Sequence, residues 1–149
     1  MTAFLLDVNV LIALGWKGHP DHVRAQRWFA RNCEVGWATC PVTQAAFVRI
    51  VSNPAFSANA VLPSEALSLL AANLRHPSHQ FWADNITLQD AVRYFEKRLV
   101  GHQQITDAYL LGLAIHKKGR LATLDRSVVE LFGRDDPRAN VVELISGKP

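Results

Sequence analysis

Residues 3–14, with the sequence AFLLDVNVLIAL, decide how this chain folds. The apolar run Ala3–Leu6 predicts a buried strand, and Val8–Leu14 predicts a short helix directly after it. Asp7 stands between them, where the strand ends and the helix begins. A buried strand followed at once by a helix is the unit from which parallel sheets are built. We therefore expect an α/β fold.

The rest of the chain alternates in the same way. Further strands are expected at 35–39, 80–83, 120–123 and 140–144, and further helices at 19–32, 41–52, 64–74, 87–99 and 105–118. Capping-box patterns at Thr87 and Ser127 favour helix starts, and Gly119 is expected to end the helix from Ile105. Alternation of this kind favours a mostly parallel sheet with helices on both faces. We expect one domain over residues 1–149, frayed from Ser146 onward.

The composition is typical of a globular protein. The chain has 149 residues, of which 49% are hydrophobic and 19% charged. Its net charge of +3 permits an anionic partner such as nucleic acid without requiring one. Cys33 and Cys40 form no CxxC pair and the histidines lack zinc-binding spacing, so we expect two buried, reduced thiols and no zinc site. No apolar run reaches the roughly 18 residues of a membrane span, and Asp7 interrupts the N-terminal run, which predicts a cytoplasmic protein without a signal peptide.

Two further aspartates stand in contexts that match that of Asp7. Asp107 lies at the start of the apolar helix expected at 105–118, and Asp125 follows the strand expected at 120–123. Such positions meet at one edge of a parallel sheet, where α/β folds place ligands. Each aspartate alone is equally well explained as a capping or turn residue. Three carboxylates together would repel each other unless a cation joined them, so the set favours a divalent metal site.

Four polar residues near the aspartates are candidates to support such a site. Asn9 could cap the first helix in place of Asp7 or orient a water, and Thr106 and Thr123 could hydrogen-bond to the acids or act as caps. Arg49 lies on the third expected helix, whose start should be near the acidic edge, and could contact a phosphate. The sequence has no glycine-rich phosphate loop and no GxSxG elbow, which disfavours nucleotide cradling and covalent hydrolysis.

The segments DVNVL at 7–11, TDAYL at 106–110 and LATLDR at 121–126 resemble the PIN-domain ribonucleases, and within them the toxins of VapBC-type toxin–antitoxin pairs. TCPVT at 39–43 and FVRIVSNP at 47–54 resemble a subgroup of those toxins. The resemblance extends from about residue 3 to residue 132 and rests on the order and spacing of the motifs. It implies an α/β/α sandwich, three or four acids that bind Mg²⁺ or Mn²⁺, endonucleolytic cleavage of RNA, dimerisation and inhibition by a cognate antitoxin.

The chain departs from this family at one position. The family usually has a glutamate on the helix after the second strand, and the aligned residue here is Gln44. An amide carries no charge to hold a cation, but it can offer one neutral oxygen or a hydrogen bond to coordinated water. The expected site therefore consists of Asp7, Asp107 and Asp125 as metal ligands, with Gln44 positioning a water.

We interpret the chain as a metal-dependent endoribonuclease toxin. The metal would lower the pKa of a bound water, and the resulting hydroxide would attack the RNA phosphodiester in line. One alternative is a catalytically weak PIN domain that binds RNA or antitoxin, because Gln44 removes a charge. Another is a phosphoryl-transfer domain of receiver or phosphatase type, although Asn9 replaces the second acid that such a phosphatase would need.

The expected partners follow from the same interpretation. They are the RNA substrate, a second copy of the chain and the antitoxin. An arginine or lysine of the antitoxin would lie near Asp7 and Asp107. The homodimer would use apolar helix surface around Trp28, Phe29 and the Leu67-Leu70-Leu74 face, although these residues could equally belong to the core.

Overall fold

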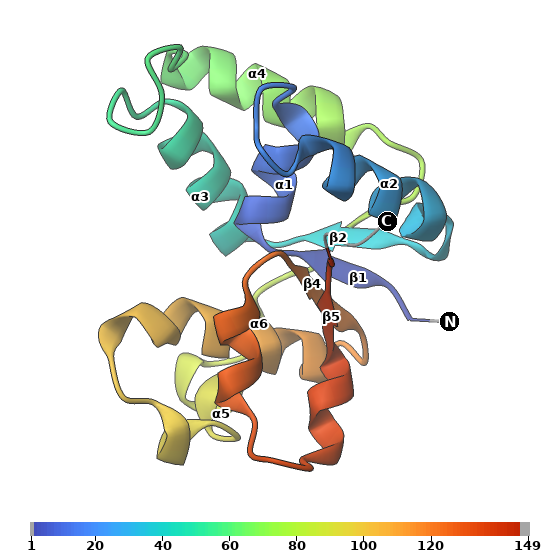
Figure 1. The fold of residues 1–149 in the computed structure, drawn as a ribbon, viewed down its shortest axis with the longest axis vertical. Helices are drawn as coiled ribbons and strands as arrows, with labels where there is room; N and C mark the ends of the chain where they lie inside the picture. Colours follow the sequence, from blue (N-terminus) through green and yellow to red (C-terminus); the bar gives the residue numbers. More distant parts are fainter. Residues whose placement is uncertain (1, 147–149) are drawn as a thin grey trace.

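A five-stranded sheet in the order β3-β2-β1-β4-β5 runs through the middle of the protein (Figure 1). All four strand pairs are parallel, which confirms the expected sheet. The computed structural model describes residues 2–146, so residues 147–149 of the tail expected to fray lie outside the described part. The strands are β1 (Phe4–Leu6), β2 (Trp37–Thr39), β3 (His79–Phe81), β4 (Arg120–Thr123) and β5 (Val142–Leu144).

Helices cover both faces of the sheet. Helices α1 to α4 lie on one face, and α5 and α6 lie on the other with several short 3₁₀ segments (Figure 1). The α-helices are α1 (Val8–Gly15), α2 (His22–Asn32), α3 (Pro41–Val51), α4 (Pro63–Leu74), α5 (Leu88–Val92) and α6 (Ile105–His116). The 3₁₀ segments are Cys33–Val35, Glu96–Arg98, His102–Gln104, Arg126–Leu131 and Pro137–Val141. No helix in the described residues is long and apolar enough to cross a membrane.

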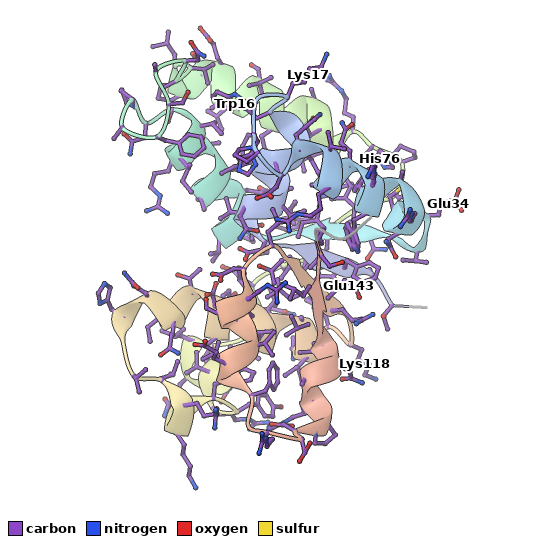
Figure 2. All side chains as sticks on the ribbon, viewed as in Figure 1. Trp16, Lys17, Glu34, His76, Lys118 and Glu143 are labelled. Carbon is purple, nitrogen blue, oxygen red and sulfur yellow. The ribbon has the colours of Figure 1, made fainter. Side chains whose placement is uncertain are left out.

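The central strand β1 contributes to both layers of the core. Leu5 packs on the α6 side of the sheet, and Phe4 and Leu6 pack on the α1 side. Successive side chains of a strand point to opposite faces, and a strand covered on both faces is therefore apolar throughout. Figure 2 shows the side chains that fill the two layers. The AFLL run is apolar because neither face of β1 meets water.

Two helices are shorter than their patterns predict. Helix α2 begins at His22 rather than His19, because the preceding residues form turns closed by the bonds His19 N→Trp16 O and His22 N→His19 O, both 3.0 Å. The helix expected over 87–99 ends as α5 at Val92. Phe95 N then donates to Val92 O at 2.8 Å, a tighter 3₁₀-type bond, as Phe95 enters the core.

The expected capping box at Ser127 is wrong. Asp125 is the N-cap of the 3₁₀ segment, and its Oδ1 accepts from Ser127 N at 2.9 Å.

The expectation that both thiols are buried is wrong for Cys33. Both cysteines are free, but Cys40 alone is buried and Cys33 is partly exposed.

The end of α6 gives Gly119 a different role from the expected one. Lys118 is the left-handed residue after the helix, with a φ of 57°, and Gly119 N donates to Ala114 O at 2.9 Å. A Cβ at position 119 would lie 2.4 Å from the Trp82 ring and 2.8 Å from the backbone oxygen of Ala3. Gly119 is therefore required by close packing and not by a positive φ.

The contact between α5 and α6 yields a stability prediction. Gly112→Ala should lower the free energy of unfolding by about 1–3 kcal/mol, the usual cost of overpacking, because a Cβ there would lie 2.0 Å from the backbone oxygen of Ala91. At an open helical site the same change would stabilise. Gly101→Ala is the control, since its Cβ would meet nothing within 4 Å. Urea unfolding followed by tryptophan fluorescence measures both, and equal stabilities would contradict the close contact.

Candidate active site

Asp7 is a buried carboxylate at the end of the central strand. It is 5% exposed and is the N-cap of α1, with extended backbone angles. Its Oδ1 accepts from Val8 N at 2.7 Å, and its Oδ2 accepts from Thr123 Oγ1 at 2.8 Å. The expectation that Asn9 would cap the helix in place of Asp7 is wrong. Capping and the Thr123 bond together fix the position of Asp7.

Thr123 connects Asp7 to the second strand-end aspartate, Asp125. The fully buried Thr123 hydroxyl donates to Asp7 and accepts from Asp125 N at 3.1 Å. The Asp125 side chain is exposed, and its Oδ1 accepts from both the backbone N and the Oγ of Ser127, at 2.9 and 2.7 Å. One oxygen of Asp125 therefore stabilises the turn, and the other is left for a ligand.

Asp107 lies in the first turn of α6 and is half-buried. Burial, followed by the negative charges of Asp7 and Asp125, raises the pKa of its carboxyl from 3.8 to about 6. Burial also raises the pKa of Asp7, against the two hydrogen bonds that lower it. The structure thus brings Asp7 and Asp125 near enough to Asp107 for their charges to disfavour the ionisation of its carboxyl.

No ion pair among the described residues balances the charge of these three carboxylates. The ion pairs within residues 2–146 are Arg24–Asp21, Arg120–Glu143 and Arg138–Asp136. None of them includes Asp7, Asp107 or Asp125. Within the same residues, no three His, Cys, Asp or Glu side chains are grouped tightly enough to hold a metal ion. The donor set nevertheless fits a hard divalent cation, because it consists of oxygens and carries uncompensated negative charge.

Gln44 lies in the first turn of α3, which follows β2 at the same edge of the sheet. It is half-buried, and its Nε2 donates to Thr39 Oγ1 at 2.9 Å. Thr39 also lies 2.8 Å from Nε2 of His79. Sequence reasoning missed both of these partners. Thr39 carries a usable signal, a polar residue at the end of an apolar strand like Thr123, whereas nothing local distinguishes His79.

The remaining candidates lie around the cluster with few contacts of their own. Asn9 is half-buried, and its Oδ1 accepts from Leu124 N at 3.5 Å, a weak bond. Thr106 is exposed beside Asp107, and Arg49 is exposed on α3. Within residues 2–146 the side chains of Thr106 and Arg49 form no hydrogen bond, so the structure leaves both available to a ligand.

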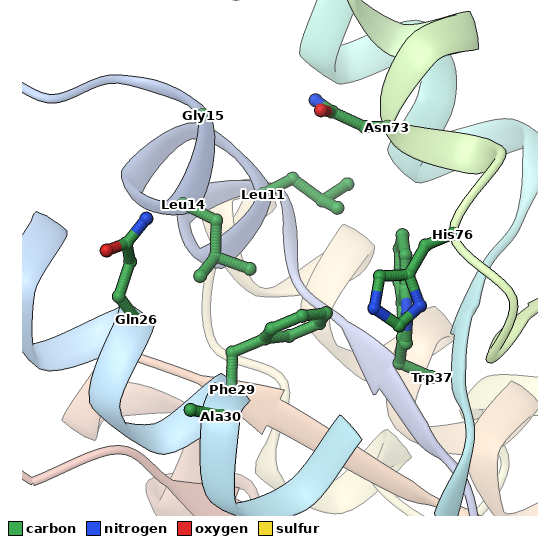
Figure 3. Close-up of a pocket in the computed structure, with 9 residues that line it drawn as sticks. All are labelled: Leu11, Leu14, Gly15, Gln26, Phe29, Ala30, Trp37, Asn73 and His76. Carbon is green, nitrogen blue, oxygen red and sulfur yellow. The ribbon is translucent and has the colours of Figure 1, made fainter. Parts of the chain in front are cut away.

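Two pockets lie beside the edge of the sheet where the strands end and the aspartates are found, and a third lies elsewhere. Asn9 lines one of about 470 Å³, and Thr106 lines another of about 360 Å³. The third, of about 370 Å³, lies between α1, α2, β2 and the end of α4 (Figure 3). Its walls include Leu14, Phe29 and His76, so Phe29 belongs to a pocket and not to a flat outer surface.

Comparison with known proteins identifies the family. The PIN domain matches residues 4–143. Ribonuclease VapC39 of Mycobacterium tuberculosis (strain ATCC 25618 / H37Rv) is 41% identical over 145 residues, 97% of this chain and 100% of the relative. Ribonuclease VapC38 of the same strain is 42% identical over 127 residues, 85% and 88% of the two chains.

A solved structure shares the fold. A chain of VapBC2 from Rickettsia felis, bound to a DNA fragment from the promoter, superposes with a TM-score of 0.60 at 13% identity, covering 97% of this chain and 99% of that one. The α/β/α arrangement therefore agrees with that of a solved structure. The chain belongs to the PIN-domain family, among its VapC ribonucleases.

Proposed function

We propose that this chain is an endoribonuclease toxin whose active site is the cluster of Asp7, Asp107 and Asp125. Its relatives are named ribonucleases, which removes the receiver and phosphatase alternative. The observation that carries the assignment of the site is the Thr123 hydroxyl, which donates to Asp7 Oδ2 at 2.8 Å and accepts from Asp125 N at 3.1 Å and so holds two of the acids at one edge of the sheet. The raised pKa of the Asp107 carboxyl, which burial and the charges of those two acids cause, supports it. Unbalanced negative charge at the edge of a parallel sheet is where a cation and an RNA phosphate can meet.

The cluster residues have distinct roles in this proposal. Asp7, Asp107 and Asp125 would hold Mg²⁺ or Mn²⁺, and Gln44 would position a water. When bound, such a cation lowers the pKa of a coordinated water and screens the charge of the phosphodiester. Thr123 keeps Asp7 Oδ2 in place through its 2.8 Å hydrogen bond.

The surroundings of the cluster suit a single RNA strand. The two flanking pockets reach Asn9 on one side and Thr106 on the other, so a strand that crosses the edge would contact both. Arg49 is exposed on α3 and can bind a phosphate oxygen. The net charge of +3 favours association with a polyanion in spite of the acidic cluster. We place this activity in the cytoplasm.

The proposed partners are an antitoxin and a second copy of the chain. An arginine or lysine of the antitoxin would form charge-assisted hydrogen bonds with the cluster and displace the cation. Of the residues expected at the dimer surface, Leu70 is only 7% exposed and belongs to the core, and Trp28, Phe29 and Leu74 are partly buried against that core. The large apolar residues that α4 and its start leave exposed are Leu62, Leu67 and Leu69.

The first functional prediction concerns cleavage. Asp7→Asn and Asp107→Asn should each reduce Mg²⁺-dependent cleavage of single-stranded RNA by more than roughly 100-fold, since loss of even an outer partner of a metal site costs 10–100-fold. Asp90→Asn, an exposed acid on α5, is the control and should retain activity. A gel assay with end-labelled RNA measures the rates. Cleavage that survives EDTA, or survives both substitutions, would refute the site.

The second concerns stability of the metal-free protein. The folded pKa of Asp107 lies above its usual 3.8, at about 6, so its ionised form destabilises the fold. This penalty is absent below about pH 4, grows as the pH rises toward 6, and is complete above. Asp107→Asn should therefore raise the Tm in EDTA at about pH 7.5 and change it little at about pH 4.

Thermal unfolding by circular dichroism checks this pH dependence, with Asp90→Asn as the exposed control. Mg²⁺ should raise the Tm of the native protein at about pH 7.5 and leave that of the Asp107→Asn variant nearly unchanged. A variant less stable than the native protein at both pH values would show that the Asp107 carboxylate is not under strain from its neighbours.

The third concerns Gln44. Gln44→Glu should strengthen Mg²⁺ binding by roughly tenfold, because an added carboxylate attracts the cation, and it should raise cleavage by less, because it also repels the RNA phosphate. Calorimetry gives the Kd. An unchanged or weaker affinity would remove Gln44 from the site. Cleavage seen with the glutamate variant and not with the native chain would favour the alternative of a catalytically weak binding module.

A further inference from the structure

A chain of hydrogen bonds runs inward from Gln44. Gln44 Nε2 lies 2.9 Å from Thr39 Oγ1, and Thr39 Oγ1 lies 2.8 Å from His79 Nε2. The Thr39 side chain ends β2 and is fully buried, while His79 lies on the neighbouring strand β3. Gln44, the first of the three hydrogen-bonded residues, belongs to the proposed site. Thr39 and His79 have no assigned role so far.

The chemistry of the groups sets the direction of these bonds. An amide N–H can only donate, so the Thr39 hydroxyl accepts from Gln44. Its own hydrogen then needs an acceptor, because an unpaired polar hydrogen in a buried position is costly. Among residues 2–146, His79 Nε2 is the remaining partner of Thr39 Oγ1. His79 therefore accepts through Nε2 and carries its proton on Nδ1.

The surroundings of His79 favour this neutral form. The centroid of its ring lies 4.8 Å from that of Trp37. Burial lowers the pKa of the His79 ring, and the nearby His76 lowers it further by a smaller effect. His76 is itself oriented, since its Nδ1 accepts from Trp37 Nε1 at 3.2 Å and from Ser78 N at 3.1 Å. A neutral His79 keeps Nε2 free to accept from Thr39 at ordinary pH.

We propose that Thr39 and His79 are positioning residues that hold the Gln44 amide with its oxygen, and not its nitrogen, available to the acidic edge. With Nε2 committed to Thr39, Oε1 accepts no hydrogen bond from residues 2–146 and is the amide atom left for a ligand. This inference rests on the proposed function, in which Gln44 lies at the site. The orientation matters because an amide oxygen attracts a cation or a water proton, whereas an NH₂ group would repel the cation.

A glutamate at position 44 would reverse the direction of both hydrogen bonds. A carboxylate cannot donate, so the Thr39 hydroxyl would donate to it and accept from His79 instead. His79 would then carry a proton on Nε2, and the added negative charge would favour the protonated ring. The tautomer of His79 thus reports the chemical identity of residue 44 through Thr39.

The test is the ¹⁵N spectrum of the imidazole nitrogens in the metal-free protein at about pH 7.5. We expect His79 protonated on Nδ1 in the native chain and in Thr39→Ser, which keeps the hydroxyl, and protonated on Nε2 in Gln44→Glu. His76 is the internal control, since its Nδ1 accepts from Trp37 and Ser78 in the native chain and none of the variants changes either partner. Protonation of Nε2 in the native chain, or a tautomer that ignores the change at Gln44, would overturn the proposal.

A double-mutant cycle tests the positioning role on the reaction. Thr39→Val and Gln44→Ala should lower cleavage by similar factors, and the double variant should be no worse than Gln44→Ala alone, because residues that act through one another are not additive. Thr39→Ser should restore the rate. Additive losses would overturn the positioning role. The His79 measurement needs neither metal nor RNA, so its result is independent of whether the nuclease function itself holds.

Discussion

The hydrogen bond from Thr123 Oγ1 to Asp7 Oδ2, 2.8 Å long, ties the carboxyl end of β4 to that of β1. Asp7 is buried and also caps α1, so a group that serves as a charged ligand candidate is at the same time a structural junction. Burying a carboxylate is costly unless it is hydrogen-bonded. The strand ends, the start of α1 and the position of the cluster therefore all depend on this pair.

The charge at this edge sets a compromise between folding and binding. Asp107 already has a pKa of about 6 because it is half-buried beside two other carboxylates. A fourth acid at position 44 would add to that repulsion in the metal-free protein. An amide at this position adds no charge, and with its nitrogen bonded to Thr39 it would keep an oxygen for the proposed site. The cost is a weaker attraction for a cation.

The proposed site and the exposed apolar residues of α4 are formed by different elements of the fold. The apolar strands carry the core, and the pockets at the edge reach Asn9 and Thr106. The apolar pocket beside Phe29 lies between helices on one face only, and α4 carries exposed leucines on that same side. Substrate contacts and contacts with a second copy of the chain can therefore occupy different parts of the molecule.

The sequence by itself determined the parallel sheet and the placement of Asp7, Asp107 and Asp125 at strand ends and helix starts. These features follow from hydrophobic period and from which residue comes next in the chain, both of which are local. Only the tertiary structure decided that Thr123 donates to Asp7, 116 residues away, and that Thr39 meets His79, 40 residues away. Such contacts depend on strand order and packing, which bring together side chains that no local pattern relates.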